Sequence, residues 1–417
     1  TVSGVAVRKA FVEHATIAPY MAATPQPDDL TSGGIAMLAS VFERFGLEGE
    51  DAAEAFHMYA SYTFGTALFA ANRRVANQEL HRGSKAGTGN GKVASPLNPE
   101  AAGPSDGMYE SFYLRAVSPD EPVSIWIRFT VQKASGRQPK ASIWFTVFDE
   151  SVGGPLARKT PSVPLERAAG SDGWISIADS VIGPRHTDGS FGDASRSIDL
   201  TDTDETLRHL PREWMYRSPI PKTKPESPVP FARFSGSFEC GGRTWKMDGW
   251  PGMLGHNWGS EHAWTWIWLH GTGFDGDPDA WIDVALGRVM VAGRLLPWVA
   301  NGAVSAGGER HRLGGLLRRG VRVEAGPGKA RLDLPGKGSL SAGVVLEAPK
   351  QSTVAWTYAS PGGHRHDVLN CSVAKIEVDL AGSGGTRHLA SEHGGTYELG
   401  LPDRQDWVGL EPIDDEW

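Results

Sequence analysis

The residues Ser124-Ile125-Trp126-Ile127-Arg128-Phe129-Thr130-Val131 alternate between two faces, and so do the residues Ser142-Ile143-Trp144-Phe145-Thr146-Val147-Phe148. A period of two is typical of β-strands. The residues between them, Ser135-Gly136-Arg137-Gln138-Pro139, carry the Gly and Pro of a hairpin loop. This stretch therefore predicts a pair of antiparallel strands.

The pattern of short strands and Gly-rich turns continues from Met108 to about residue 400, without a long amphipathic helix. Parallel βαβ architecture is thereby disfavoured, and antiparallel barrels or sandwiches are expected. Six prolines between Pro211 and Pro230 suggest a crossover. We expect two β domains, 108–235 and 236–417, although no internal repeat supports the division.

The first part of the chain differs, because residues 1–82 have apolar residues at helical spacing. The third of the expected helices, from Glu50 to about Ala76, has a wide apolar surface that includes Phe56, Tyr59 and Phe64. Such a surface predicts a helical module that forms a homodimer. Residues 83–107 are rich in Gly and Pro and predict a linker.

The helical segment resembles the C-terminal ligand-binding and dimerisation region of tetracycline-repressor-family regulators. The likeness is carried by Phe45-Gly46-Leu47, Glu50-Asp51-Ala52-Ala53-Glu54-Ala55-Phe56, Tyr62-Thr63-Phe64-Gly65, Ala67 and Leu68. It implies dimerisation and, more weakly, ligand sensing. The DNA-reading helix-turn-helix of such regulators would have to precede Thr1, and whether a domain is missing there stays open.

Composition and net charge indicate the class of protein and the kinds of partner to expect. The 417 residues are 40% apolar and 22% charged, which is typical of globular chains of two or three domains. A net charge of −8 argues against nucleic acid, because neutralising phosphates needs a basic surface. Cys240 and Cys371 cannot form a disulfide framework, and no apolar run of 18 residues or export signal is visible, so we expect a cytoplasmic protein.

Four of the chain's 15 Trp residues fall in the segment Gly255-His256-Asn257-Trp258-Gly259-Ser260-Glu261-His262-Ala263-Trp264-Thr265-Trp266-Ile267-Trp268-Leu269-His270-Gly271, and three of them stand at alternate positions of one expected strand. Alternation sends Trp264, Trp266, Trp268 and His270 to one face. Such a wall of indoles is either barrel core or the lining of a ligand site, and an indole face also stabilises a passing cation.

This segment resembles the lipocalin-like two-barrel superfamily of carotenoid 1,2-hydratase, tocopherol cyclase and Diels-Alderase-type cyclases. The shared motif is Gly-x-Asn-Trp-Gly, here 255–259, followed by Trp-x-Trp, here 264–266. The segment 108–113, Met-Tyr-Glu-Ser-Phe-Tyr, is similar to the start of the family's first barrel. The resemblance implies a site for a long apolar substrate between two barrels. Hydratases often have an acid just before the His, whereas Leu254 and Gly255 stand here, which argues against hydration.

These residues yield two hypotheses. The first is a lyase, isomerase or cyclase that moves protons on an isoprenoid- or polyketide-like molecule, without a cofactor. Its candidate catalytic residues are His256, Glu110, Glu261 and Asp283, and its candidate substrate-binding residues are Asn257, Trp258, Trp264, Trp266, Trp268, Tyr109 and His262. The second is a non-catalytic carrier or sensor of an apolar ligand.

Asp283 stands inside an apolar strand, so it is an anchor of hydrogen bonds, a solvent-facing residue or an acid of raised pKa. Metal sites are disfavoured, because His256 and His262 lack a third ligand at metal-binding spacing. The loop 274–279 lacks the closing Glu of a calcium loop. The chain also lacks Gly-x-Ser-x-Gly and phosphate-binding Gly-rich motifs, so hydrolases and nucleotide-dependent enzymes lose their usual support.

Overall fold

The computed structural model describes residues 107–164, 174–218, 220–291, 293–315, 320–383, 385–402, 410 and 413. The predicted helical module, its dimerisation and nearly all of the predicted linker lie outside these residues. Within the described ranges, no helix is long and apolar enough to cross a membrane.

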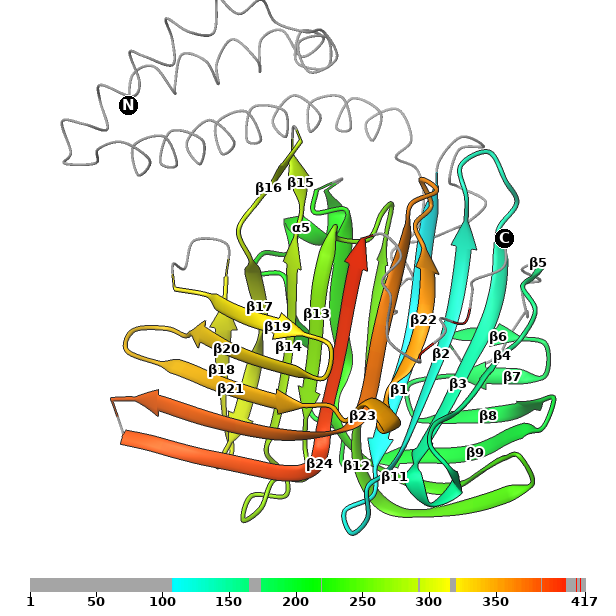
Figure 1. Ribbon diagram of the computed structural model, residues 1–417, viewed down its shortest axis with the longest axis horizontal. Helices are drawn as coiled ribbons and strands as arrows, with labels where there is room; N and C mark the ends of the chain where they lie inside the picture. Colours follow the sequence, from blue (N-terminus) through cyan, green and yellow to red (C-terminus); the bar gives the residue numbers. More distant parts are fainter. Residues whose placement is uncertain are drawn as a thin grey trace, which may run out of the picture. The chain divides into compact units, whose positions relative to one another are not determined.

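Two antiparallel sheets, each curved into a half-barrel, make up the described structure (Figure 1). The first sheet has the order β4-β3-β2-β1-β12-β11-β9-β8-β7-β6, with β10 beside β11 and β5 beside β3. Its strands are β1 (Met108–Val117), β2 (Val123–Lys133), β3 (Lys140–Asp149), β4 (Leu156–Lys159), β5 (Val163–Pro164), β6 (Ile175–Ile177), β7 (Ser180–Ile182), β8 (His186–Phe191), β9 (Ala194–Thr201), β10 (Leu207–Arg208), β11 (Thr223–Cys240) and β12 (Arg243–Gly259).

The second sheet has the order β18-β17-β14-β13-β24-β23-β21-β20-β19, with β22 beside β23. Its strands are β13 (Thr265–Gly271), β14 (Trp281–Arg288), β17 (Val299–Ala306), β18 (Glu309–Gly314), β19 (Arg322–Gly326), β20 (Lys329–Pro335), β21 (Ser341–Glu347), β22 (Val354–Ala359), β23 (Arg365–Gly382) and β24 (Gly385–Pro402). Short elements complete the described structure: η1 (Glu150–Val152), α5 (Trp214–Arg217), β15 (Met290–Val291), β16 (Arg294–Leu295) and η2 (Lys350–Ser352).

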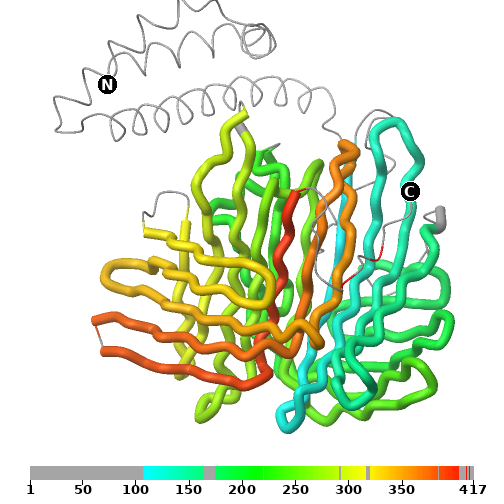
Figure 2. Tube along the Cα trace, in the orientation of Figure 1, coloured from blue at the N-terminus to red at the C-terminus, as the bar shows by residue number. Residues whose placement is uncertain are grey.

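The two sheets lie side by side, as the tube in Figure 2 shows. β1, β2 and β3 contact β23 of the other sheet, and β11 contacts β14. Alternation along β2 explains how one strand serves two cores. Ile125, Ile127 and Phe129 point into the first core, whereas Trp126 belongs to the second. The strands at this seam are therefore buried on both faces.

The predicted strands 124–131 and 142–148 are confirmed as parts of β2 and β3, which pair antiparallel with Phe129 opposite Ile143. The mainly β class and the two antiparallel units are confirmed as well. A boundary between residues 235 and 236 is wrong, because β11 runs through it and pairs with β12 in the first sheet.

The physical reason for this error is the proline content of β11. Pro225, Pro228 and Pro230 lie inside this strand, where the register against β12 shifts between Glu226 and Val229 and again between Val229 and Ala232. Such irregularities tolerate prolines, which cannot donate to the ladder. The change of sheet falls instead between Gly259, the end of β12, and Thr265, the start of β13.

Candidate functional site

Two glycines of the motif let β12 pass closely between its neighbours. A Cβ on Gly255 would lie 2.1 Å from the ring of Tyr113 on β1. Gly259 has a φ of +158°, and a Cβ there would lie 1.7 Å from the carbonyl oxygen of Lys222. The glycines are therefore required by close approach. Alternation along β12 puts His256 and Trp258 on one face, where His256 stacks on Phe112 of the first core and Trp258 packs with Leu210, Met215 and Tyr216, and it puts Asn257 on the other face.

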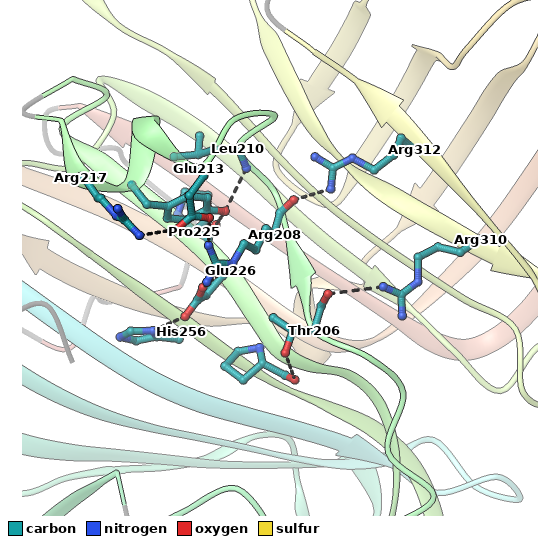
Figure 3. Close-up of polar contacts among 12 residues, drawn as sticks. Thr206, Arg208, Leu210, Glu213, Arg217, Pro225, Glu226, His256, Arg310 and Arg312 are labelled. Carbon is teal, nitrogen blue, oxygen red and sulfur yellow. Dashed lines mark hydrogen bonds and ion pairs between the residues drawn. The ribbon is translucent and has the colours of Figure 1, made fainter. Parts of the chain in front are cut away.

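His256 is held between two carboxylates that come from different strands. Its Nε2 lies 2.8 Å from Oε1 of Glu110 on β1. Its Nδ1 lies 3.0 Å from Oε1 of Glu226 on β11, the contact that Figure 3 shows. All three side chains are buried. The pairing of Phe112 with His256 across the ladder puts Glu110 one step along the same face. The three residues form a carboxylate–imidazole–carboxylate cluster.

The ring of His256 is also covered on its faces. Phe112 stacks on it with centroids 4.1 Å apart, and Trp258 stacks on it at 4.5 Å. Burial alone lowers the pKa of His256, but hydrogen bonds and charges from Glu110 and Glu226 outweigh burial, so the pKa is raised above 6.5. Both ring nitrogens are engaged, and no position on the ring is left for a substrate proton.

The raised pKa of His256 gives the first prediction. The folded state holds this proton more tightly than the unfolded chain, so the stabilisation is complete below pH 6.5 and is lost as the pH rises through the folded pKa. His256→Gln should remove this decline of the unfolding free energy above pH 6.5. NMR titration of the ring protons should show a raised pKa that falls in Glu226→Gln. A titration at or below 6.5 in the native chain would contradict the cluster.

Asp283, on β14, is an anchor of hydrogen bonds rather than an acid of raised pKa. Its carboxylate is fully buried and accepts from Trp268 Nε1 at 3.1 Å, from Ser227 Oγ and from His209 Nε2 at 3.3 Å. Burial by itself raises its pKa, but His209, His270 and Ser227 outweigh burial, and the pKa is lowered below 3.8. The carboxylate is therefore ionised at neutral pH, and it ties β11 and the residue that follows β10 to the second sheet.

Aromatic rings gather at the seam between the sheets around His262, which lies in the connection from β12 to β13. Tyr109 of β1 lies 4.0 Å from its ring, and Trp266 of β13 lies 5.5 Å away, between centroids. Tyr358 of β22 stacks on Trp266 at 6.1 Å, and His366 of β23 lies 5.1 Å from Trp266. We call these five residues the seam cluster. The predicted binding residues Tyr109, His262 and Trp266 are thus brought together.

Two buried charged residues, Arg128 and Glu398, contact the seam cluster. The guanidinium of Arg128 lies 4.1 Å from the centroid of the Tyr358 ring and donates to Ser111 Oγ at 2.9 Å. Glu398 accepts from Trp266 Nε1 at 2.9 Å and from Tyr358 Oη at 3.3 Å. The positive charge lies on the first sheet and the negative charge on the second.

His262 is neutral at pH 7. Withdrawal of the ring from water lowers its pKa, and the charges of Arg128 and His366 lower it further, well below 6.5. The side chain is half-buried, as are Trp266 and Asn257. Asn257 Oδ1 is buried without a hydrogen-bond partner in the described structure. The seam cluster therefore presents the neutral imidazole of a half-buried residue, whereas the amide oxygen of Asn257 lies out of reach of solvent.

Other predicted residues lie around this centre. Glu261 is partly exposed and forms an ion pair with Lys222. Trp264 precedes β13, is half-buried and lies 6.4 Å from the ring of His364. Trp268 lies deeper, against Tyr113 at 5.1 Å. The face predicted for Trp266, Trp268 and His270 is confirmed, because Ile267 and Leu269 lie in the second core.

Sequence reasoning missed Arg128, Glu226, Tyr358 and Glu398. Glu226 lies between the prolines of β11, where no alternation is visible. Tyr358 and Glu398 lie in ordinary strands whose partners are far along the chain. The sequence offered one signal for these residues, namely the charged Arg128 inside the largely apolar run 124–131.

Among the described residues, no group of three or more His, Cys, Asp or Glu side chains is placed to hold a metal ion. In the loop 274–279, Asp277 accepts from the backbone N–H of Gly307 at 2.8 Å and pairs with Arg387 at 3.6 Å. These contacts use the carboxylate that a calcium site would need.

Comparison with known proteins gives distant relatives. No family model matches the chain. An uncharacterised protein of Mycobacterium tuberculosis, from strains CDC 1551 and H37Rv, is 26% identical over 296 residues, covering 71% of this chain and 87% of the relative. An AttH-like structure from Nitrosomonas europaea gives a TM-score of 0.42 at 13% identity, covering 76% of this chain and 99% of that one. Kievitone hydratase from Nectria haematococca gives 0.40 at 9% identity, covering 76% and 96%. Similarities this low do not transfer an activity.

Proposed function

We propose that this protein is an enzyme of the lyase, isomerase or cyclase type that moves a proton on the carbon framework of an apolar, unsaturated molecule. The isoprenoid- or polyketide-like substrate docks against the half-buried side of the seam cluster. One observation carries the proposal: a neutral, half-buried His262 stands among aromatic rings at the seam. A neutral imidazole is a proton acceptor at pH 7.

The charges at the seam support abstraction of a proton over protonation of an alkene. Arg128 is close enough to lower the pKa of His262, and a positive field of this kind stabilises an anion that forms beside it. The same field opposes a carbocation. In this mechanism His262 takes a proton from carbon next to a carbonyl group, and Arg128 stabilises the resulting enolate-like charge.

Other residues of the seam have supporting roles in this proposal. Burial raises the pKa of Tyr109 to about 12, so its hydroxyl stays protonated, and it donates to Thr223 at 3.3 Å. Asn257 orients a polar group of the substrate through its amide. Trp266 supplies an apolar wall. The proton-transfer role passes from His256 to His262, because both nitrogens of His256 are engaged by carboxylates.

A second candidate is a carrier of the same kind of molecule, without catalysis. The observation that favours it is the absence, among the described residues, of a hydrogen-bond partner that orients the ring of His262. Catalytic histidines are usually oriented by a third group. Binding would need only the aromatic surface of the seam cluster.

Deuterium exchange separates the two candidates. The chain is incubated in D₂O with a panel of enones and cyclic ketones that carry isoprenoid or polyketide skeletons, and the molecules are examined by mass spectrometry. An enzyme should incorporate solvent deuterium into at least one of them, and His262→Gln should abolish incorporation. His388→Gln, at an exposed histidine of β24, is the matched control. Binding without exchange would leave the carrier as the function.

A further inference from the structure

A hollow lies on the surface where the two sheets meet, and none of the residues of the seam cluster lines it. It has a volume of about 420 Å³, which is within the size range of small-molecule sites. We call it the arginine groove, and its lining residues are Thr206, Leu207, Arg208, Leu210, Pro211, Arg212, Glu213, Arg310 and Arg312. Both sheets contribute, because β10 belongs to the first and β18 to the second (Figure 3).

The lining has four arginines and one carboxylate, in a chain whose net charge is −8. Arg312 donates to the carbonyl oxygen of His209 at 3.0 Å and to that of Arg208. Arg310 donates to the carbonyl oxygen of Glu205 at 2.7 Å and pairs with Asp204 at 2.7 Å. These contacts hold Arg310 and Arg312 in place. The four arginines outnumber Asp204, Glu213 and Glu226, the carboxylates that pair with Arg208 and Arg310, so the groove keeps a net positive charge.

Arg212 and Arg208 supply cations that are open to solvent. Arg212 is exposed and has no ion pair among the described residues. Arg208 pairs with Glu213 and lies 5.3 Å from the centroid of the Tyr216 ring. Leu210 and Pro211 give the same groove an apolar wall. A ligand that fits this chemistry has an oxyanion at one end and an apolar body at the other.

Arg208 also connects the groove to the first core. Its Nε lies 3.9 Å from Oε2 of Glu226, whose other oxygen accepts from His256 at 3.0 Å. An anion on Arg208 competes with Glu226 for the guanidinium. The carboxylate that loses this partner then holds the proton of His256 more tightly.

We propose that the arginine groove binds an organic oxyanion, a phosphate or carboxylate on an apolar body, and that its occupancy is sensed by His256 through Arg208 and Glu226. This site is separate from the seam cluster and does not depend on the proposed enzymatic activity.

Calorimetry on the full chain tests the binding with four probes: inorganic phosphate, pyrophosphate, hexyl phosphate and hexanoate. Hexyl phosphate or hexanoate should bind at least about tenfold more tightly than inorganic phosphate, because apolar surface is buried as well. Whichever of the two binds more tightly identifies the head group. Arg212→Gln and Arg208→Gln should each weaken binding about tenfold, as loss of a charge-assisted contact does. Arg137→Gln, in the exposed turn between β2 and β3, loses the same charge and should bind as the native chain does.

NMR of the His256 ring provides the second readout. The bound probe should raise the pKa of His256 in the native chain and leave it unchanged in Arg208→Gln. Equal binding by Arg137→Gln, Arg208→Gln and Arg212→Gln, or no preference for the alkyl probes over inorganic phosphate, would mean an adventitious ion only and would overturn the proposal. Binding that leaves the His256 titration unchanged would overturn the coupling. Arg212→Gln removes no contact within the described fold, so it keeps the test valid if Arg208→Gln is unstable.

Discussion

Asp283→Ala should lower the free energy of unfolding by about 3–5 kcal/mol, the range for breaking a buried, hydrogen-bonded charge network. The substitution leaves the Nε1–H of Trp268 and the ring of His209 without their acceptor in a buried place. It also removes the hydrogen bond that the Ser227 hydroxyl of β11 donates to β14. Urea denaturation of the native and variant chains measures the difference.

Asp275→Ala is the matched control, because Asp275 is exposed in the turn before β14. It should change stability by no more than about 0.5 kcal/mol. The pKa of Asp283 is lowered below 3.8, so its contribution is present above that pH and is lost as the pH falls through the folded pKa. The difference between the native chain and Asp283→Asn should therefore shrink in acid. An Asp283→Ala variant as stable as the native chain would contradict the role of Asp283 as an anchor of the two sheets.

Local periodicity made the strand class predictable. In β2, successive residues point to opposite faces, so Trp126 and Ile127 reach different cores, and this alternation is the period of two that identifies the strand. On β13 the alternation also placed Trp266 and Trp268 on the face opposite Leu269. The face on which a side chain lies depends only on its position along the strand, so the sequence alone predicts it.

Strand pairing is not local, and this limits what the sequence shows about the site. Glu110 and His256 are 146 positions apart, and they meet only because β1 pairs with β12. The sequence around Asp283 left three roles for this residue open. The side chains that decide between them, His209 and Ser227, come from the part of the chain that forms the first sheet. Because of its prolines, β11 was not predicted as a strand, and Glu226, which lies in it, was not identified as a site residue.

The two-barrel resemblance identified the stretch that contains both His256 and His262, but it could not show how each imidazole is surrounded. His256 stands in the motif, yet the fold covers its ring and engages both nitrogens. His262, six positions later, reaches the seam because β12 ends at Gly259 and the chain crosses to the other sheet. Which histidine meets solvent is decided by that crossing, and spacing alone does not reveal it.

For a molecule identified in the deuterium screen, we expect Trp266→Ala to lower mainly the binding affinity and His262→Gln to lower mainly the turnover. Trp266→Ala removes an indole from the half-buried side of the seam cluster, and affinity should fall by roughly 10- to 100-fold, in proportion to the apolar area lost. Trp214→Ala is its control, because that indole is 49% exposed on α5, and affinity should not change.

His262→Gln keeps a polar side chain of similar reach, so affinity should change by less than about threefold while turnover falls by roughly 10²- to 10⁴-fold, as expected when a general base is lost. Calorimetry gives the affinity, and the rate of deuterium incorporation gives the turnover. If His262→Gln weakens binding as strongly as Trp266→Ala and any remaining exchange continues at the native rate, His262 only packs against the ligand. The seam cluster would then be a binding surface, because a group that moves protons must affect the rate more than the affinity.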